Sequence, residues 1–143
     1  MPDAYFAYGS NLSPARMRER VAGAASLGAA RLPGFRLALD KRGADGSGKA
    51  NLHESPGDAV WGALYALGPA DWLRLDGFEP GYERIRVEVE WRGSRRAAWT
   101  YASRQLTPEP VPRAWYKRLI VEGARVQGLP EEWIGLLEAL PER

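Results

Sequence analysis

The sequence of 143 residues contains no cysteine and a single histidine, His53. The absence of cysteine excludes disulfides, thiolate zinc sites and cysteine nucleophiles. One histidine leaves too little for a histidine metal cluster or a serine–histidine relay, so we expect no metal site. His53 is open to two interpretations, as a general base or as an ordinary polar residue of a strand or loop.

Long apolar runs are also missing, and no segment approaches the length needed to cross a bilayer. The N-terminal residues do not resemble a signal peptide, so we expect a cytoplasmic protein without a membrane partner. The 20 basic residues nearly balance the 18 acidic ones and are interleaved with them. The one compact basic cluster, Arg92, Arg95 and Arg96, falls in an expected hairpin turn, so we expect no nucleic-acid partner.

Hydrophobic periodicity predicts several strands in what we expect to be one domain over residues 1–143. The clearest alternation covers residues 85–91 and 97–101, which a turn at 92–95 joins into a hairpin. Weaker strand patterns cover residues 5–8, 35–39, 50–53 and 59–67, the last apolar on nearly every position. Turn residues at 32–34 and 55–58 separate these segments, and residues 24–31 are small and irregular.

Helical spacing and capping residues predict four helices, over residues 14–22, 69–75, 113–126 and 130–140. On the third helix, we expect Trp115, Leu119 and Val126 to share the apolar face, broadened by Tyr116 and Ile120. On the fourth helix, the expected apolar face holds Trp133, Leu136, Leu137 and Leu140. About five or six early and central strands, with helices inserted and at the end, indicate an α+β fold.

The stretch from Tyr5 to Pro14 reads as a strand, a tight turn and a helix start. Its aromatic residues suit a strand, Gly9 suits a tight turn, and Ser13 before Pro14 suits a helix cap and first helical position. Such a junction points unpaired backbone N–H groups and the positive end of a helix dipole at one spot, which suits an anion or oxyanion. Plain turn chemistry explains the same residues, so both interpretations stay open.

A glycine-rich segment over residues 43–50 matches the phosphate-loop spacing of a glycine, four residues, a glycine and a lysine. Ala50 stands where a phosphate loop has the Ser or Thr whose hydroxyl holds magnesium. Residues 51–53 do not resemble a helix start, which a phosphate loop requires. A flexible or hairpin loop is therefore the preferred interpretation over a nucleotide site.

Glu79 is the candidate for proton-transfer chemistry. It lies between an aromatic residue and a proline. Such neighbours can partly desolvate the carboxyl group and favour its neutral form, which is the usual way to make a carboxylate a useful general base. A solvated loop acid fits the same residues. We expect Asp76 to be structural, and Tyr101 and Tyr116 to belong to the core unless their position makes a hydroxyl a substrate contact.

Several motifs, taken together, resemble the γ-glutamylcyclotransferase family, whose fold is also called AIG2-like. In the family's order, the matches are residues 6–12 (FAYGSNL), residues 55–62 (SPGDAVWG), Leu75-Asp76 with Glu79 and Tyr82, Tyr116-Lys117, Gly123-Ala124 and Gly128-Leu129-Pro130. These matches cover nearly the whole chain and are specific as a set. Only the Tyr-Gly-Ser-Asn stretch is specific by itself.

This resemblance implies a mixed, barrel-like β-sheet with flanking and C-terminal helices. It also implies a cofactor-free reaction that splits a small γ-glutamyl amino acid or γ-glutamyl amine into 5-oxoproline and a free amine, with a homodimer left open. Glu79 falls on the family's catalytic glutamate and Tyr116 on a substrate-contacting tyrosine. The substrate-binding loop falls on Ala7, Tyr8, Gly9, Ser10 and Asn11.

The implied chemistry suits a chain with so few reactive side chains. The α-amine of the substrate attacks its own γ-carbonyl, so ring closure supplies proximity without an enzyme nucleophile. The protein must supply a carboxylate that moves protons, and N–H donors for a carboxylate or developing oxyanion. Glu79 and the turn at Gly9 and Ser10 would be these two parts.

Two differences from the family leave the substrate open. Many members follow the glutamate with a glycine and a longer loop, whereas Pro80 follows here, and Tyr82 comes three residues after Glu79. This leaves the pocket shape and the leaving group undetermined. The glutathione-specific branch has a different residue in place of Asn11, so glutathione ranks below other γ-glutamyl compounds. The alternative function is a domain that binds a γ-glutamyl or carboxylate ligand without turnover.

Overall fold

The computed structural model of the protein describes residues 4–143, and its five strands close into a barrel in the order β1-β3-β2-β4-β5. β1 runs antiparallel to β3 and parallel to β5, so the barrel is mixed. The strands are β1 (Ala4–Ala7), β2 (Ala25–Arg42), β3 (Gly48–Ala66), β4 (Glu83–Trp91) and β5 (Ser94–Ala102). The predicted α+β fold with a mixed, barrel-like sheet is confirmed.

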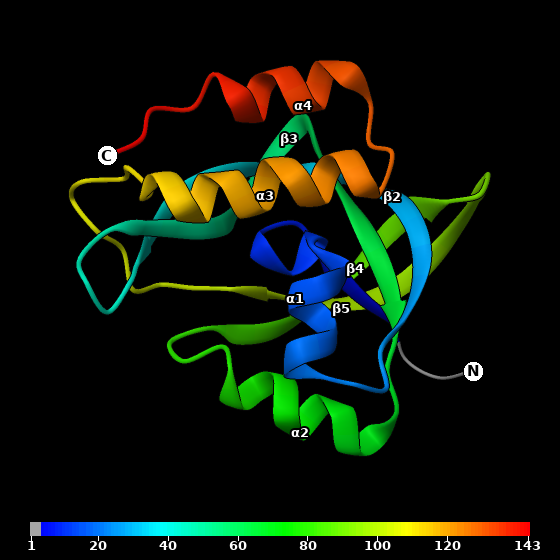
Figure 1. Ribbon diagram of the computed structural model, residues 1–143. Helices are drawn as coiled ribbons and strands as arrows, with labels where there is room; N and C mark the ends of the chain where they lie inside the picture. Colours follow the sequence, from blue (N-terminus) through cyan, green and yellow to red (C-terminus); the bar gives the residue numbers. More distant parts are fainter. Residues whose placement is uncertain (1–3) are drawn as a thin grey trace.

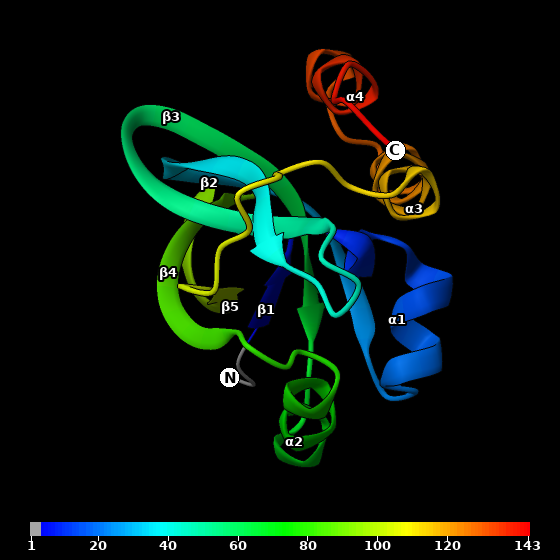
Figure 2. The same cartoon turned by 90° about the vertical axis from the view of Figure 1, so that its left-hand side faces the viewer.

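The four expected α-helices are present within two residues of their predicted ends. They are α1 (Pro14–Arg20), α2 (Pro69–Gly77), α3 (Ala114–Val126) and α4 (Glu131–Glu138), and a 3-10 helix, η1 (Ser10–Leu12), precedes α1. α3 and α4 lie side by side at one end of the molecule and α2 at the other (Figures 1 and 2). Every helix in residues 4–143 is too short or too polar to cross a lipid bilayer.

The prediction of turns and irregular chain around β2 and β3 is wrong. Residues 24–34 lie almost entirely in β2, and residues 55–58 lie in β3, so the two strands form one long curved hairpin (Figure 2). Pairing passes from Pro33 opposite Ala59 to Phe35 opposite Glu54, which leaves residues 55–58 as a bulge. The proline and glycine of each segment therefore bend a continuing strand instead of ending it.

Two hydrophobic cores lie on the two faces of β1. Phe6 belongs to the core inside the barrel, where Leu64 and Val89 are also buried. Tyr5 points to the other face and packs against Tyr65 and Trp72 in the second core. Successive side chains of a strand point to opposite faces, so burial on both faces anchors β1 on both sides. The turn that follows β1 therefore starts from a rigid support.

The buried face of α3 differs from the prediction. Tyr116, Ile120 and Ala124 are buried, whereas Trp115 is 48% exposed and Val126 is 70% exposed. The reason is a close approach to η1 at Gly123, where an added Cβ would lie 2.6 Å from backbone atoms of Leu12 and Ser13.

On α4, the buried side chains are Trp133, Ile134 and Leu137. The predicted core residue Leu136 is instead 48% exposed. The period of the hydrophobic pattern predicted both helices. Which face of each helix packs against the barrel is set by its packing partners.

Candidate active site

The strand, turn and helix predicted at the start of the chain are confirmed, with η1 inserted between β1 and α1. Ser13 caps α1, since its hydroxyl oxygen accepts a hydrogen bond of 3.2 Å from the backbone N–H of Arg16. Gly9 is required by close packing, because an added Cβ would lie 2.9 Å from the Cβ of Ala50. Within residues 4–143, no protein acceptor takes up the backbone N–H groups of residues 9–11, which leaves them as donors for a ligand.

Glu79 lies directly against this turn, although it follows α2 in the sequence. Its side chain is 14% exposed, and its Oε1 accepts hydrogen bonds from Asn11 Nδ2 at 3.0 Å and from Arg20 NH1 at 3.3 Å. Burial raises the pKa of Glu79 to about 7, against the opposing effects of the Arg20 charge and the Asn11 hydrogen bond. At neutral pH the carboxyl group is therefore balanced between its acid and base forms.

Asn11 joins Glu79 to the second core. Its Nδ2 donates to Glu79 and also to the hydroxyl oxygen of Tyr5 at 2.9 Å, while its Oδ1 accepts from Arg20 at 3.3 Å. The backbone carbonyl of Asn11 accepts a hydrogen bond of 2.9 Å from the Tyr65 hydroxyl. With 3% exposure and all these partners, the Asn11 amide holds one orientation and positions the carboxyl group of Glu79.

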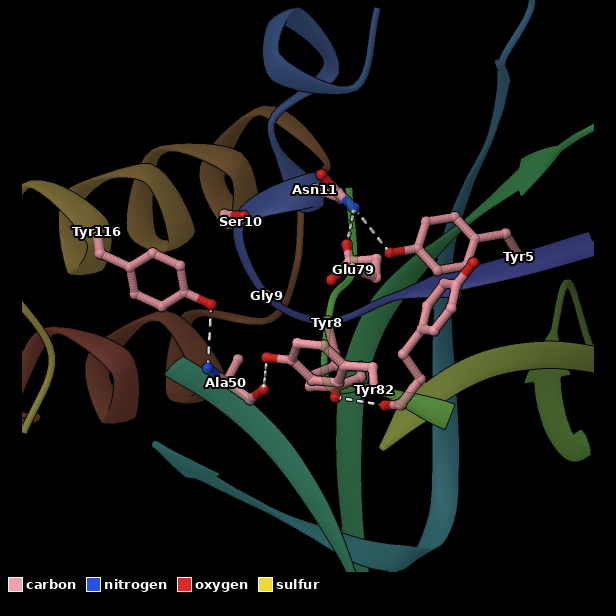
Figure 3. A pocket seen from close by; sticks show the side chains of 10 residues that line it. Tyr5, Tyr8, Gly9, Ser10, Asn11, Ala50, Glu79, Tyr82 and Tyr116 are labelled. Atoms are coloured by element: carbon pink, nitrogen blue, oxygen red, sulfur yellow. Dashed lines mark hydrogen bonds between the residues drawn. The ribbon is translucent and has the colours of Figure 1, made fainter. Parts of the chain in front are cut away.

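Tyrosine hydroxyl groups form the wall of the pocket beside Glu79 (Figure 3). Tyr116 from α3 accepts a hydrogen bond of 3.0 Å from the backbone N–H of Ala50, and Tyr82 donates one of 2.6 Å to the Ala50 carbonyl. Tyr8 donates to the backbone carbonyl of Tyr101 at 2.6 Å. Burial raises the pKa of Tyr116 to about 12, so its hydroxyl is neutral at physiological pH and acts through hydrogen bonds.

The structure brings most of the sequence-predicted site residues into one cavity. The lining residues are Tyr5, Tyr8, Gly9, Ser10, Asn11, Ala50, Glu79, Tyr82, Tyr101 and Tyr116. Ala7 is the exception, since it is fully buried in the second core and does not line the cavity. The sequence did not identify Tyr5 or Ala50 as residues of this site, because their places in it depend on the pairing of distant strands.

Three other candidates lie outside this cavity or have structural roles. His53 pairs with Asp40 at 2.8 Å and does not line the cavity. Asp76 accepts a hydrogen bond of 2.6 Å from the Tyr101 hydroxyl, a structural contact. The segment at residues 43–47 is the hairpin loop between β2 and β3, and a strand follows it instead of a helix, which rules out a phosphate loop.

The arrangement is suited to proton transfer beside a bound anion. A carboxyl group that titrates near neutrality lies next to unpaired backbone N–H groups and several neutral hydroxyls. Among the described residues, no group of three or more His, Asp or Glu side chains is placed to hold a metal ion. The reactive groups that line the cavity are the Glu79 carboxyl group and several hydroxyls.

Comparison with known proteins identifies relatives of the chain in sequence and in fold. The sequence model of the AIG2-like family matches residues 59–137. The γ-glutamylcyclotransferase of Homo sapiens is 34% identical over 95% of this chain and 77% of its own length, and that of Bos taurus is 36% identical over 90% of this chain and 73% of its own length. A solved structure of a γ-glutamyl cyclotransferase superposes with a TM-score of 0.89 at 31% identity, covering 100% of this chain and 90% of that one.

The protein is a closed mixed β-barrel in which a carboxyl group that is 14% exposed lies against the turn after β1. The chain belongs to the AIG2-like, γ-glutamylcyclotransferase family and is an enzyme of this type. The resemblance inferred from the sequence motifs is thereby confirmed for the family and for the fold.

Proposed function

We propose that the protein converts γ-glutamyl amino acids or γ-glutamyl amines into 5-oxoproline and the free amine, with Glu79 as general acid and base. The observation that carries this proposal is the hydrogen bond of 3.0 Å from the Asn11 amide of the turn to the carboxyl group of Glu79. Burial of this carboxyl group raises the pKa of Glu79 to about 7. A base whose pKa lies near the working pH is present in its reactive form and can also return the proton.

The reaction balances with protons alone. The α-ammonium group of the substrate loses one proton to become a nucleophile and attacks its own γ-carbonyl carbon, which forms the new C–N bond of a five-membered lactam. The attacking nitrogen then loses a second proton, and the bond between the γ-carbon and the leaving nitrogen breaks. Glu79 transfers protons from the first nitrogen to the second, so the reaction consumes no water and needs no cofactor.

The turn would hold the γ-glutamyl end of the substrate. The unpaired N–H groups of residues 9–11 can donate to the substrate carboxylate or to the oxyanion that develops on the γ-carbonyl. Tyr116 accepts the Ala50 N–H, which leaves its own hydroxyl proton for a substrate oxygen. Ser10 accepts a hydrogen bond of 3.1 Å from Arg16 Nε and likewise keeps its proton.

A substrate panel tests this proposal directly. The purified protein is incubated with γ-glutamyl dipeptides, γ-glutamyl amines and glutathione, and 5-oxoproline is quantified. We expect product from the dipeptides or the amines and less from glutathione. No product from any compound, together with measurable binding by calorimetry, would support the alternative of a domain that binds a γ-glutamyl ligand without turnover.

A cytoplasmic location stays a prediction from the sequence, and a homodimer stays open. A part in glutathione metabolism is implied only by the resemblance to the family. The single domain over residues 1–143 likewise stays a prediction from the sequence. Light scattering of the purified chain would measure its oligomeric state.

A further inference from the structure

A second, larger cavity adjoins the pocket of Glu79 and extends outward from it. The inner cavity encloses about 300 Å³ of empty space and the outer one about 510 Å³, part of it open to solvent. Both are lined by Ser10, Glu79, Tyr82 and Tyr116, so they meet at the carboxyl group that would move the protons. The outer cavity is also lined by four cationic side chains, those of Arg16, Arg20, Lys41 and Lys49, and we call it the basic chamber.

The two arginines of the basic chamber are held by the site itself. Arg16 Nε donates to Ser10 at 3.1 Å, and Arg20 NH1 contacts Glu79 at 3.3 Å. The Arg20 guanidinium also lies 5.2 Å from the centroid of the Phe78 ring. These contacts fix the positions of two positive charges at the junction of the two cavities.

The two lysines have aromatic neighbours in place of carboxylate partners. Lys41 is only 7% exposed, and its Nζ lies 5.0 Å from the centroid of the Tyr82 ring. Lys49 Nζ lies 4.4 Å from the ring centroid of Trp115 and 4.3 Å from that of Tyr116. In the described part of the chain, neither ammonium group has a carboxylate oxygen within 4.0 Å.

Burying two ammonium groups without carboxylate partners lowers the stability of the free protein. A buried ammonium group loses its hydration, and aromatic faces offset only part of that loss. Burial lowers the pKa of Lys41 and of Lys49, which shows that the nearby acids do not compensate it fully. Those acids are Glu79, which is already bonded to Arg20, and Asp45, which is bonded to Arg113 and Ser47.

We propose that the basic chamber binds the leaving group of the substrate, and that this leaving group is an amine that carries one or more carboxylates. The leaving nitrogen must lie beside Glu79, and the inner cavity at the turn is taken by the γ-glutamyl end, so the rest of the leaving group extends into the chamber. An amino acid leaving group brings one carboxylate, and an acidic amino acid such as glutamate or aspartate brings two. The chamber therefore selects γ-glutamyl dipeptides with an acidic second residue over γ-glutamyl amines.

This inference rests on the proposed function and names its substrate class. It also explains Lys49, the lysine of the glycine-rich segment that resembles a phosphate loop in sequence. The residues 43–44 of that segment line the chamber as well. The hairpin loop thus contributes an anion-binding group without forming a nucleotide site.

Four substrates with the same γ-glutamyl part test the selection. They are γ-glutamyl-glutamate, γ-glutamyl-alanine, γ-glutamyl-alaninamide and γ-glutamyl-ethylamine, and kcat/KM is measured for each from 5-oxoproline release. We expect kcat/KM to fall about tenfold when the second carboxylate is lost and about tenfold again when the first is lost, as for hydrogen bonds between charged groups. Equal values for the four compounds, or higher values for the amines, would overturn the inference and leave the proposed function intact.

Substitutions of the two lysines test whether these side chains cause the preference for acidic substrates. In Lys41→Met with Lys49→Met, we expect the ratio of kcat/KM between γ-glutamyl-glutamate and γ-glutamyl-ethylamine to shrink about tenfold or more, mainly through KM. Lys49→Arg should restore most of the ratio that Lys49→Met loses. The matched control is Arg95→Gln, which removes one positive charge from an exposed hairpin position and should not change the ratio.

The remaining outcomes are also decisive. An equal loss for all four substrates would show that the lysines bind the γ-glutamyl end, which overturns the inference. If Lys41→Met does not fold, Lys49→Met at a less buried position carries the same test alone. If no compound yields 5-oxoproline, the proposed function fails. Calorimetry with the four compounds then tests anion binding by the chamber separately. Equal affinities would overturn the inference, and tighter binding of γ-glutamyl-glutamate would support it.

Discussion

Asn11 and Glu79 are 68 residues apart in the sequence and are joined by a hydrogen bond of 3.0 Å from the side-chain amide to the carboxylate. This bond links the turn after β1 to the segment after α2. It positions the carboxyl group, but it does not cancel the effect of burial, which raises the pKa of Glu79 to about 7. The two halves of the candidate site are therefore coupled through one buried amide.

Replacing Glu79 by Gln should remove turnover while leaving binding measurable. The amide keeps the shape of the carboxyl group but cannot accept and return a proton, so we expect kcat to fall by about 10²- to 10⁴-fold. The measurement is 5-oxoproline release together with calorimetric binding of a γ-glutamyl dipeptide. Glu83→Gln, at an exposed position of β4, is the control, and undiminished activity of Glu79→Gln would show that the base lies elsewhere.

The pH dependence of activity should follow the titration of Glu79. The base must be ionised in the free enzyme, so we expect kcat/KM to rise with pH up to about 7 and then to level off. A rising limb centred near the ordinary glutamate pKa of 4.5 would contradict the assignment.

The stability of the protein should respond to the same group in a defined direction. The folded-state pKa of Glu79 is raised from 4.5 to about 7, so the folded chain binds this proton more tightly than the unfolded chain. The resulting stabilisation is fully present below pH 4.5 and is lost as the pH rises to about 7. Glutamine does not titrate, so Glu79→Gln should not show this loss. Between pH 4.5 and pH 7, the difference in unfolding free energy between variant and wild type should therefore change in favour of the variant by on the order of 3 kcal/mol, measured by denaturant titration.

Replacing Asn11 by Asp should move the activity profile to higher pH. A second carboxylate at the position of the amide repels the charge of Glu79 and removes a hydrogen bond that favours its ionised form. We expect the rising limb of kcat/KM to shift upward by about one pH unit or more. A limb that does not move in this variant would assign the titration to a different group.

Replacing Gly123 by Ala should destabilise the protein through the contact between α3 and η1. The added Cβ would lie 2.6 Å from backbone atoms of Leu12 and Ser13, so the helix or the turn must shift. We expect a loss of about 1–3 kcal/mol in unfolding free energy and a reduced kcat/KM. Gly135→Ala in α4 is the matched control, because nothing lies within 4 Å of its added Cβ and alanine favours the helix. Equal stabilities of the two variants would contradict the role of this contact.

The sequence by itself determined the elements whose residues carry their own local reasons. Alternation along β4 and β5 predicted the hairpin, and proline and glycine placed the helix ends within two residues. The strand, turn and helix start from Tyr5 to Pro14 could be predicted because each step depends on neighbouring residues. The aromatic and proline neighbours of Glu79 left a desolvated and a solvated carboxyl group both open, and the structure describes the side chain as 14% exposed.

Only the tertiary structure decided the features that depend on distant partners. The segments at residues 32–34 and 55–58 continue as bulged strands because each pairs with the other, which no local pattern reveals. Tyr116 faces the site while Trp115 is exposed, because Gly123 sets how α3 packs against η1. In the sequence, Lys49 was notable only as the lysine of the phosphate-loop spacing, and no motif pointed to Lys41. Closure of the barrel places both lysines in the chamber that Glu79 also lines. The same long-range packing buries their ammonium groups without a carboxylate partner among the described residues, which is why we propose an anionic ligand there.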